Sequence, residues 1–334
     1  MKKKIFKRVF IVLVLLMSTI SLFGCNKTNK KIENFPEYVA NLESYKLTGK
    51  LYSMFPTGTK ESLITVYYQK PDNYRVELDN STNGDKQIIL KNTNGVFILV
   101  PSLNKSFQIK SGWPINSSYP YLLQSISKDF VNDEDKLITE ENNNVIVEMD
   151  VKMFENAGLS KQKVLFSKET KLPTEVQVFD EQQNLVSRFV FLNFEENIDL
   201  ENDLFEKEPT MTSTVETYSQ LEYTRVNTYP TYYPTNTELK DEKIMRSGEV
   251  KTVIMNYHGD IAYTIVEEYV FKNDLEKTDY VDGDIYILGD SVAVVNKTNL
   301  TFVSGGIEYF IASNNLSILE MARMGNSLLN GEEK

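Results

Sequence analysis

Apolar and polar residues alternate with a period of two along much of this chain of 334 residues. Successive side chains on a strand point to opposite faces, so this alternation is typical of a sheet with one buried face. Clusters of Asp, Asn, Gly and Pro, which favour turns, separate the alternating stretches. The spacing predicts an antiparallel meander. We expect strands at residues 45–51, 63–68, 74–78, 87–91, 96–100, 106–110, 144–149, 161–167, 175–180 and 186–194.

Two stretches have a helical period instead. Phe35, Tyr38, Val39 and Leu42 recur at i, i+3, i+4 and i+7, which predicts a short helix over residues 36–43. A second apolar face predicts a helix over residues 120–130. The fold class is therefore mainly β, of the α+β kind.

The N-terminus has the layout of a secretory signal. Five basic residues precede an apolar run over residues 9–20 that is short for a membrane-spanning helix. The stretch Leu22-Phe23-Gly24-Cys25 resembles a bacterial lipobox, although Phe23 is larger than the usual residue. The resemblance implies cleavage between Gly24 and Cys25, lipidation of Cys25, and anchoring to the outer face of the cell membrane. We expect a signal peptide at residues 1–24 and a tether at residues 25–34. The alternative is an uncleaved anchor with an incidental cysteine.

Charge limits the partners. The whole chain has a net charge of −11, and removal of the signal leaves 31 basic and 47 acidic residues, or −16. Nucleic-acid binding depends on neutralising phosphates with Lys and Arg, so we expect no nucleic-acid partner. Such acidity suits a basic protein partner instead.

Few residues are suited to catalysis or to metal binding. His258 is the only histidine and Cys25 the only cysteine, so a zinc site of the His/Cys type cannot be assembled once Cys25 carries a lipid. His258 stands in MNYHGD, which predicts a strand followed by a turn. No glycine-rich phosphate-binding motif is present. Adjacent carboxylates such as Glu140-Glu141 and Glu195-Glu196 point to opposite faces of a strand. We therefore expect no catalytic residue, no metal, no cofactor and no enzymatic activity.

One loop is similar to the start of a calcium-binding loop. Residues 79–85 read DNSTNGD, with oxygen-bearing side chains at alternate positions and glycine at the sixth. The twelfth position, where a bidentate Glu is required, is Leu90. Because both flanks alternate like strands, the stretch predicts a hairpin loop.

Four stretches carry a resemblance to a known family: KPDNYRVEL, IILKNTNGVFILVPSLNKSFQ, KVLFSKETKLPTEVQVFDEQQNLV and FLNFEENIDLENDLFE. Their order and spacing resemble the LolA-type lipoprotein carriers over residues 35–205, about half of the chain. Residues 94–101 match the family's sequence pattern of a glycine, a strand and a proline. Residues 168–173 match the turn before its Leu-Pro pair, with Lys168 in the usual aspartate position. The last sequence pattern of the family, with spaced Phe and Ile residues, is matched by Phe194, Ile198 and Phe205.

The resemblance implies a LolA-like curved, open antiparallel half-barrel over helices. Its concave apolar face would take an acyl chain or a peptide. The alternative is that the helix near residues 122–130 fills the concavity. With the parity of each strand assumed, the residues expected to line the cavity are Leu63, Val76, Ile89, Phe97, Leu99, Val164, Phe166, Val176 and Val178.

We expect a LolA-like domain at residues 35–207, a Thr- and Pro-rich linker at 208–228, and a small α+β domain at 229–334. The stretch NLTFVSGGIEYFIASNNLSILEMARMGNSL resembles a small extracytoplasmic domain of Gram-positive envelope and anti-sigma proteins, which implies no chemistry.

Three functions follow for such a lipoprotein of a Gram-positive, spore-forming bacterium. The first is a non-enzymatic module that binds a lipid or acylated ligand in envelope or spore-envelope biogenesis. The second rests on a resemblance to the germination lipoproteins of the GerS type, which implies a scaffold that activates a cell-wall amidase in spore cortex maturation. The third is a sensor of envelope stress.

Overall fold

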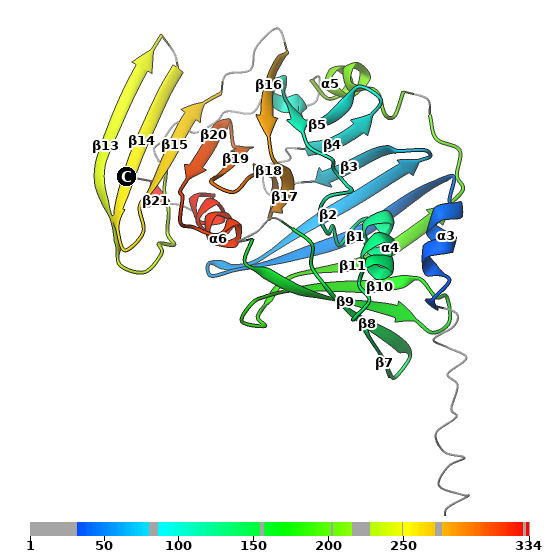
Figure 1. The fold of residues 1–334 in the computed structure, drawn as a ribbon. Coiled ribbons are helices and arrows are strands. Elements are labelled where there is room, and N and C mark those ends of the chain that lie inside the picture. The colour runs from blue at the N-terminus through cyan, green and yellow to red at the C-terminus, as the bar shows by residue number, and fades with distance from the viewer. Residues whose placement is uncertain are drawn as a thin grey trace, which may run out of the picture.

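The computed structural model describes residues 32–79, 86–153, 157–201, 203–215, 228–248, 250–270, 276–329 and 332–333. Two open sheets dominate it (Figure 1). The larger has the strand order β16-β6-β5-β4-β3-β2-β1-β11-β10-β9-β8-β7, and the smaller β13-β14-β15-β20-β19-β18-β17. The prediction of a mainly β, α+β fold with an open sheet is confirmed.

The larger sheet consists of two antiparallel meanders, β1 to β6 and β7 to β11, joined where β1 pairs with β11, and β16 pairs in parallel with β6 at one edge. Its strands are β1 (Ser44–Phe55), β2 (Gly58–Gln69), β3 (Asn73–Asp79), β4 (Lys86–Asn92), β5 (Gly95–Val100), β6 (Lys105–Lys110), β7 (Leu137–Glu141), β8 (Asn144–Asp150), β9 (Leu159–Ser167), β10 (Pro173–Asp180), β11 (Leu185–Glu196) and β16 (Lys277–Asp282).

The smaller sheet comes entirely from the C-terminal part of the chain. Its strands are β13 (Thr237–Ser247), β14 (Val250–Gly259), β15 (Tyr263–Tyr269), β17 (Asp284–Leu288), β18 (Ser291–Val295), β19 (Asn299–Ser304) and β20 (Ile307–Ala312). A short ribbon joins β12 (Thr228–Tyr229) to β21 (Glu332–Glu333). The helices are α3 (Phe35–Asn41), the 3-10 helix η1 (Pro101–Leu103), α4 (Leu123–Asn132), α5 (Lys207–Val215) and α6 (Ile318–Leu328).

The main hydrophobic core lies on one face of the larger sheet. Alternate residues of β1, β3, β8, β9 and β10 are buried, as their sequences predict. Helices α3 and α4 pack side by side against this face (Figure 1). The rings of Phe35 in α3 and Phe166 in β9 meet edge to face at 5.0 Å.

The C-terminal unit, which consists of the smaller sheet and α6, shares this core. Ile285, Ile287, Val292, Val294 and Val303 belong to the same cluster of buried residues as the interior of the larger sheet. Most of the smaller sheet's own apolar side chains pack with α6 in a second cluster. The N-cap of α6 is Ser317, whose hydroxyl accepts a hydrogen bond from Glu320 N at 3.1 Å.

Seven described elements were not predicted: η1, β7, β12, β13, β16, β21 and α5. Helix α5 begins at the last residue of the predicted LolA-like domain, runs into the predicted linker, and packs on the opposite face of the larger sheet, near β4 and β5. The hairpin predicted at residues 79–85 is confirmed by its flanks, because Asp79 pairs with Lys86 across β3 and β4. Within the described ranges, no helix has the length and apolar character needed to cross a bilayer. The predicted signal peptide, Gly24 and Cys25 lie outside the described residues.

Candidate functional site

Six of the nine predicted cavity residues share the core face of the larger sheet. Each is at most 6% exposed and belongs to the main cluster with α3 and α4. They are Val76, Ile89, Val164, Phe166, Val176 and Val178. The structure therefore brings this subset together as tightly packed core.

The other three residues are not on that face. Phe97 and Leu99 of β5 belong to a separate cluster on the opposite face, with Phe205 and Met211. Leu63 is 38% exposed. The prediction that all nine line one cavity is wrong for these three. β5 is buried on both faces, so its sequence has no alternation from which the parity could be read.

A chain of aromatic side chains runs through the core that α3 and α4 cover. Trp113 meets Tyr74 and Tyr119 at ring-centroid distances of 5.5 and 5.8 Å. Tyr121 continues the chain, 5.9 Å from Tyr119 and 6.3 Å from Phe189. All five are at most 4% exposed. The loop between β6 and α4, which carries Trp113, Tyr119 and Tyr121, fills space that an open half-barrel would leave to a ligand.

Two cavities lined by described residues of this core are small. One of about 60 Å³ lies where β1, β10 and β11 approach β17, and among the nine predicted residues only Val178 lines it. A second, of about 170 Å³, is lined by residues that include Leu47, Leu123, Phe191 and Phe194. An apolar cavity of about 150 Å³ takes a molecule the size of benzene, and drug-sized ligands occupy about 300–1,000 Å³. Neither space suits a whole acyl chain.

A third space lies in the C-terminal unit. It is a surface groove of about 450 Å³, lined by Tyr229, Tyr233, Tyr257 and Leu239 among others. None of the nine predicted residues contributes to it.

Burial shapes the polar groups around the core. It raises the pKa of the Tyr119 and Tyr121 hydroxyls above their ordinary range, so both stay protonated. It also raises the pKa of Asp129 in α4, whose carboxylate accepts a hydrogen bond from Gln162 Nε2 at 2.7 Å. The bond between Gln162 and Asp129 joins α4 to β9, and no nucleophile and base are paired among these groups.

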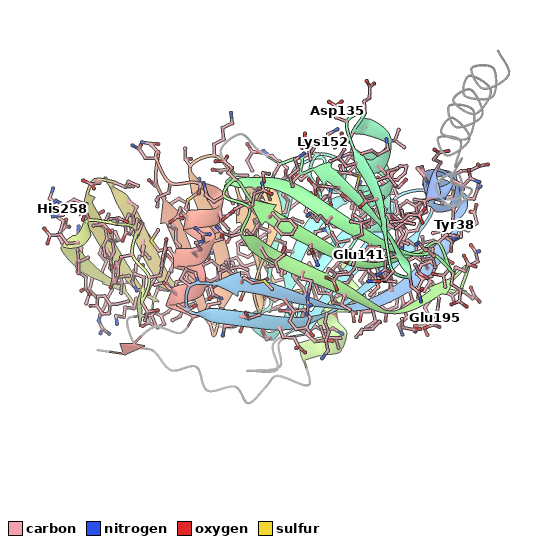
Figure 2. All side chains as sticks on the ribbon, turned by 90° about the horizontal axis from the view of Figure 1, so that it is seen from below. Tyr38, Asp135, Glu141, Lys152, Glu195 and His258 are labelled. Carbon is pink, nitrogen blue, oxygen red and sulfur yellow. The ribbon has the colours of Figure 1, made fainter. Side chains whose placement is uncertain are left out.

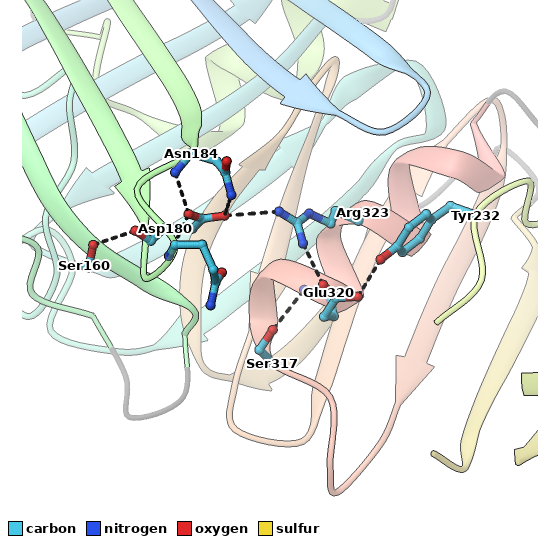
Figure 3. A network of polar contacts seen from close by, with 8 residues as sticks. Ser160, Asp180, Asn184, Tyr232, Ser317, Glu320 and Arg323 are labelled. Carbon is cyan, nitrogen blue, oxygen red and sulfur yellow. Dashed lines mark hydrogen bonds and ion pairs between the residues drawn. The ribbon is translucent and has the colours of Figure 1, made fainter. Parts of the chain in front are cut away.

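A polar network joins the two units (Figure 3). Asp180, at the end of β10, is 1% exposed and accepts hydrogen bonds from Asn184 N at 2.8 Å and Gln182 N at 3.0 Å. Arg323 of α6 lies 3.5 Å from Asp180 Oδ2 and 2.6 Å from Glu320 Oε1. Tyr232 donates to Glu320 Oε2 at 2.8 Å, and burial together with this bond raises the Tyr232 pKa to about 12. The arrangement is that of an interface.

His258 lies at the far end of the molecule from Tyr38 (Figure 2). It is at the end of β14, as predicted, 3.3 Å from Glu238 Oε1, and its side chain is 50% exposed. Among the described residues, no three His, Cys, Asp or Glu side chains are grouped so that they could hold a metal ion.

Comparison with known proteins gives one strong sequence match and several weak structural ones. The chain is 29% identical over 333 residues to "Sporulation protein YdcC" of Bacillus subtilis strain 168, and the alignment covers 98% of each chain. The fold is similar to the Pseudomonas aeruginosa MucA/MucB complex structure, with a TM-score of 0.33, 13% identity and coverage of 88% of this chain and 98% of that one. It is also similar to a LolA superfamily protein from Nitrosomonas europaea, with a TM-score of 0.33, 11% identity and coverage of 55% and 98%.

The family model described as "Sporulation protein YdcC-like" matches residues 3–205, which is more than half of the chain. The chain therefore belongs to the Sporulation protein YdcC-like family.

Proposed function

We propose that this sporulation-related chain is a non-enzymatic scaffold, tethered through lipidated Cys25 to the extracytoplasmic face of a membrane, that binds a protein partner. The observation that carries the proposal is the filled core. Trp113, Tyr119 and Tyr121 occupy the face that would otherwise hold a ligand, and two cavities beside them among the described residues measure only about 60 and 170 Å³. A carrier of acyl chains needs a larger space.

Charge favours a basic partner. The chain without its signal has a net charge of −16, so opposite charge would speed the encounter and favour the correct orientation. A cell-wall amidase is the partner that the resemblance to GerS-type lipoproteins implies. The chain would act by holding the enzyme near the membrane from which the spore cortex is built.

The test combines binding and ligand content. The lipidated chain would be extracted in mild detergent from membranes of sporulating cells and mixed with the purified cell-wall amidases of the same organism. We expect one amidase to co-elute with it and to cleave spore peptidoglycan faster in its presence. Native mass spectrometry should show no ligand beyond the lipid on Cys25.

A second candidate function, binding of one end of an acyl chain, is favoured by one observation. The cavity of about 170 Å³ is flanked by Leu192, which is 55% exposed, and by the partly buried Phe191 and Phe194. Leu172→Trp would place an indole in this cavity, and Leu137→Trp, at a position 61% exposed on β7, is the matched control. A lipid mass increment in the wild type and in Leu137→Trp that Leu172→Trp abolishes, without any amidase binding, would replace the scaffold proposal with this one.

A further inference from the structure

Strand β13 is exposed along almost its whole length. It forms one edge of the smaller sheet, and ten of its eleven residues are exposed. Figure 1 shows it at the opposite side of the molecule from α3. Among the described strands, β13 pairs with β14 alone. A strand edge presents a row of backbone donors and acceptors that another strand can pair with.

The strand also carries apolar side chains at its surface. Ile244 is 49% exposed, Met245 40% and Leu239 39%. Ile244 lies opposite Val253 of β14, which is fully buried, so Ile244 is on the core face of the sheet. The smaller sheet therefore extends one strand beyond the elements that cover its core face.

The sequence of β13 is complementary to itself in one register. Two antiparallel copies related by a two-fold axis perpendicular to the sheet must place one residue opposite its own copy. If the axis passes through residue 241, 242 or 243, that residue lies directly opposite its own copy, which brings together two Asp, two Glu or two Lys side chains. Like charges directly opposite each other are destabilising. An axis at residue 245 sets Ile244 against Arg246.

An axis at Ile244 avoids these conflicts. It sets Ile244 against its own copy, and Glu242 against Arg246 of the second copy on both sides of the axis, all on the core face. Lys243 then opposes Met245. The regular pairing spans residues 241–247 and ends where the register shift between Leu239 and Asp241 interrupts the strand.

We propose that two copies of the chain associate edge to edge through β13, antiparallel, with Ile244 at the two-fold axis and reciprocal Glu242–Arg246 ion pairs. The pairing covers Ile244 and joins the two smaller sheets into one. Copies tethered to one membrane meet at a raised local concentration, which supports an interface of this modest size. The proposal does not depend on the identity of the scaffold's partner.

Single cysteines test the register. Directly opposed residues of antiparallel strands have Cα atoms about 4.5–5.5 Å apart, within the range of a disulfide. Full-length Ile244→Cys in native membranes, at physiological salt, should give a disulfide-linked dimer on mild oxidation. Thr237→Cys is the matched control on the same strand, because its two copies would lie about 48 Å apart. The wild-type chain, whose only cysteine is Cys25, is the control for cross-linking through that residue. Equal cross-linking of both variants would overturn the proposal.

Charge reversal tests the ion pairs. In the Ile244→Cys background, Glu242→Arg and Arg246→Glu should each lower the dimer yield at least fivefold, and the double variant should restore it. Glu242 also accepts a hydrogen bond from Tyr229 at 2.7 Å, so thermal unfolding of each variant must show that it remains folded. If the double variant is folded and its yield stays as low as that of either single variant, the proposed register is wrong.

Discussion

At the scale of single residues, Glu267 is the buried carboxylate with the most measurable consequence. It is fully buried in β15 and accepts a hydrogen bond from Thr228 Oγ1 at 2.6 Å, which fixes the start of β12. Burial raises the Glu267 pKa to about 7. Because the fold binds this proton more tightly than the unfolded chain, its contribution to stability is complete below about pH 4.5 and is lost as the pH rises through 7.

Glu267→Gln should remove this pH dependence. The amide keeps an acceptor for Thr228 without the cost of a buried charge, so we expect the variant to be more stable than wild type at pH 8 by up to roughly 3 kcal/mol, with little difference at pH 5. Urea unfolding at the two pH values measures it. Glu268→Gln, on the opposite face of β15, is the control. An equal change at both pH values would show that burial of the charge is not the cause.

Gly49 of β1 has a different constraint, set by space. A Cβ atom there would lie 2.2 Å from Phe189 Cζ and 2.7 Å from the carbonyl oxygen of Val190. The ring can shift only into a packed core, and the paired backbone cannot move away. We expect Gly49→Ala to lower the free energy of unfolding by about 3 kcal/mol. Lys50→Ala, next to it and half exposed, should change it by less than about 0.5 kcal/mol. Denaturant titration of both variants compares them.

At the scale of elements, how well the sequence predicts a strand depends on what covers it. β3 and β10 alternate between buried and more exposed residues, so their sequences indicate a strand with one buried face, and in the structure Val76, Val176 and Val178 lie on that face. β4 and β5 are covered on both sides, by the core and by α5, and their apolar runs could not reveal which residues face which way. β13 has no buried face, and its sequence reads as a polar loop.

Strand β16 was missed for a related reason, since a distant part of the chain positions it. Lys105 of β6, 1% exposed, pairs with Asp279 at 2.9 Å and with Glu308 of β20. Burial alone would lower the pKa of Lys105, but these two carboxylates raise it above its ordinary value. The ion pairs hold β16 and the C-terminal unit against the edge of the larger sheet.

Lys105→Met should weaken the attachment of β16 to β6 at the edge of the larger sheet. Removing one partner from a buried ion pair leaves the carboxylates without compensation, so we expect a loss of about 3 kcal/mol in unfolding free energy and faster hydrogen exchange across residues 277–282. Lys277→Met is the control, because the Lys277 side chain is 51% exposed and its ammonium lies 3.6 Å from Asp279 Oδ2. Unchanged exchange in Lys105→Met would mean that the backbone pairing with β6 suffices.

At the scale of the whole molecule, the sequence indicated two successive folding units and gave no sign of how much they share. Turn residues and strand spacing indicate where each strand ends. Ile285 and Val294, however, lie in short apolar stretches that predict only strands of the second unit. In the structure they pack into the core of the first. Such contacts depend on complementary shape across the chain, which a local pattern does not encode.

This shared core predicts that the full chain unfolds in one transition. The two units are joined by five buried side chains of the C-terminal unit in the main cluster, by β16 in the larger sheet, and by the ion pairs of Lys105 and Arg323. Separating them would expose apolar surface on both sides at once, which couples their stabilities. Differential scanning calorimetry should therefore show a single peak whose calorimetric and van't Hoff enthalpies agree. Lys105→Met and Arg323→Met should move that whole peak to lower temperature, whereas two peaks, only one of them moved by either variant, would show that the units are energetically independent.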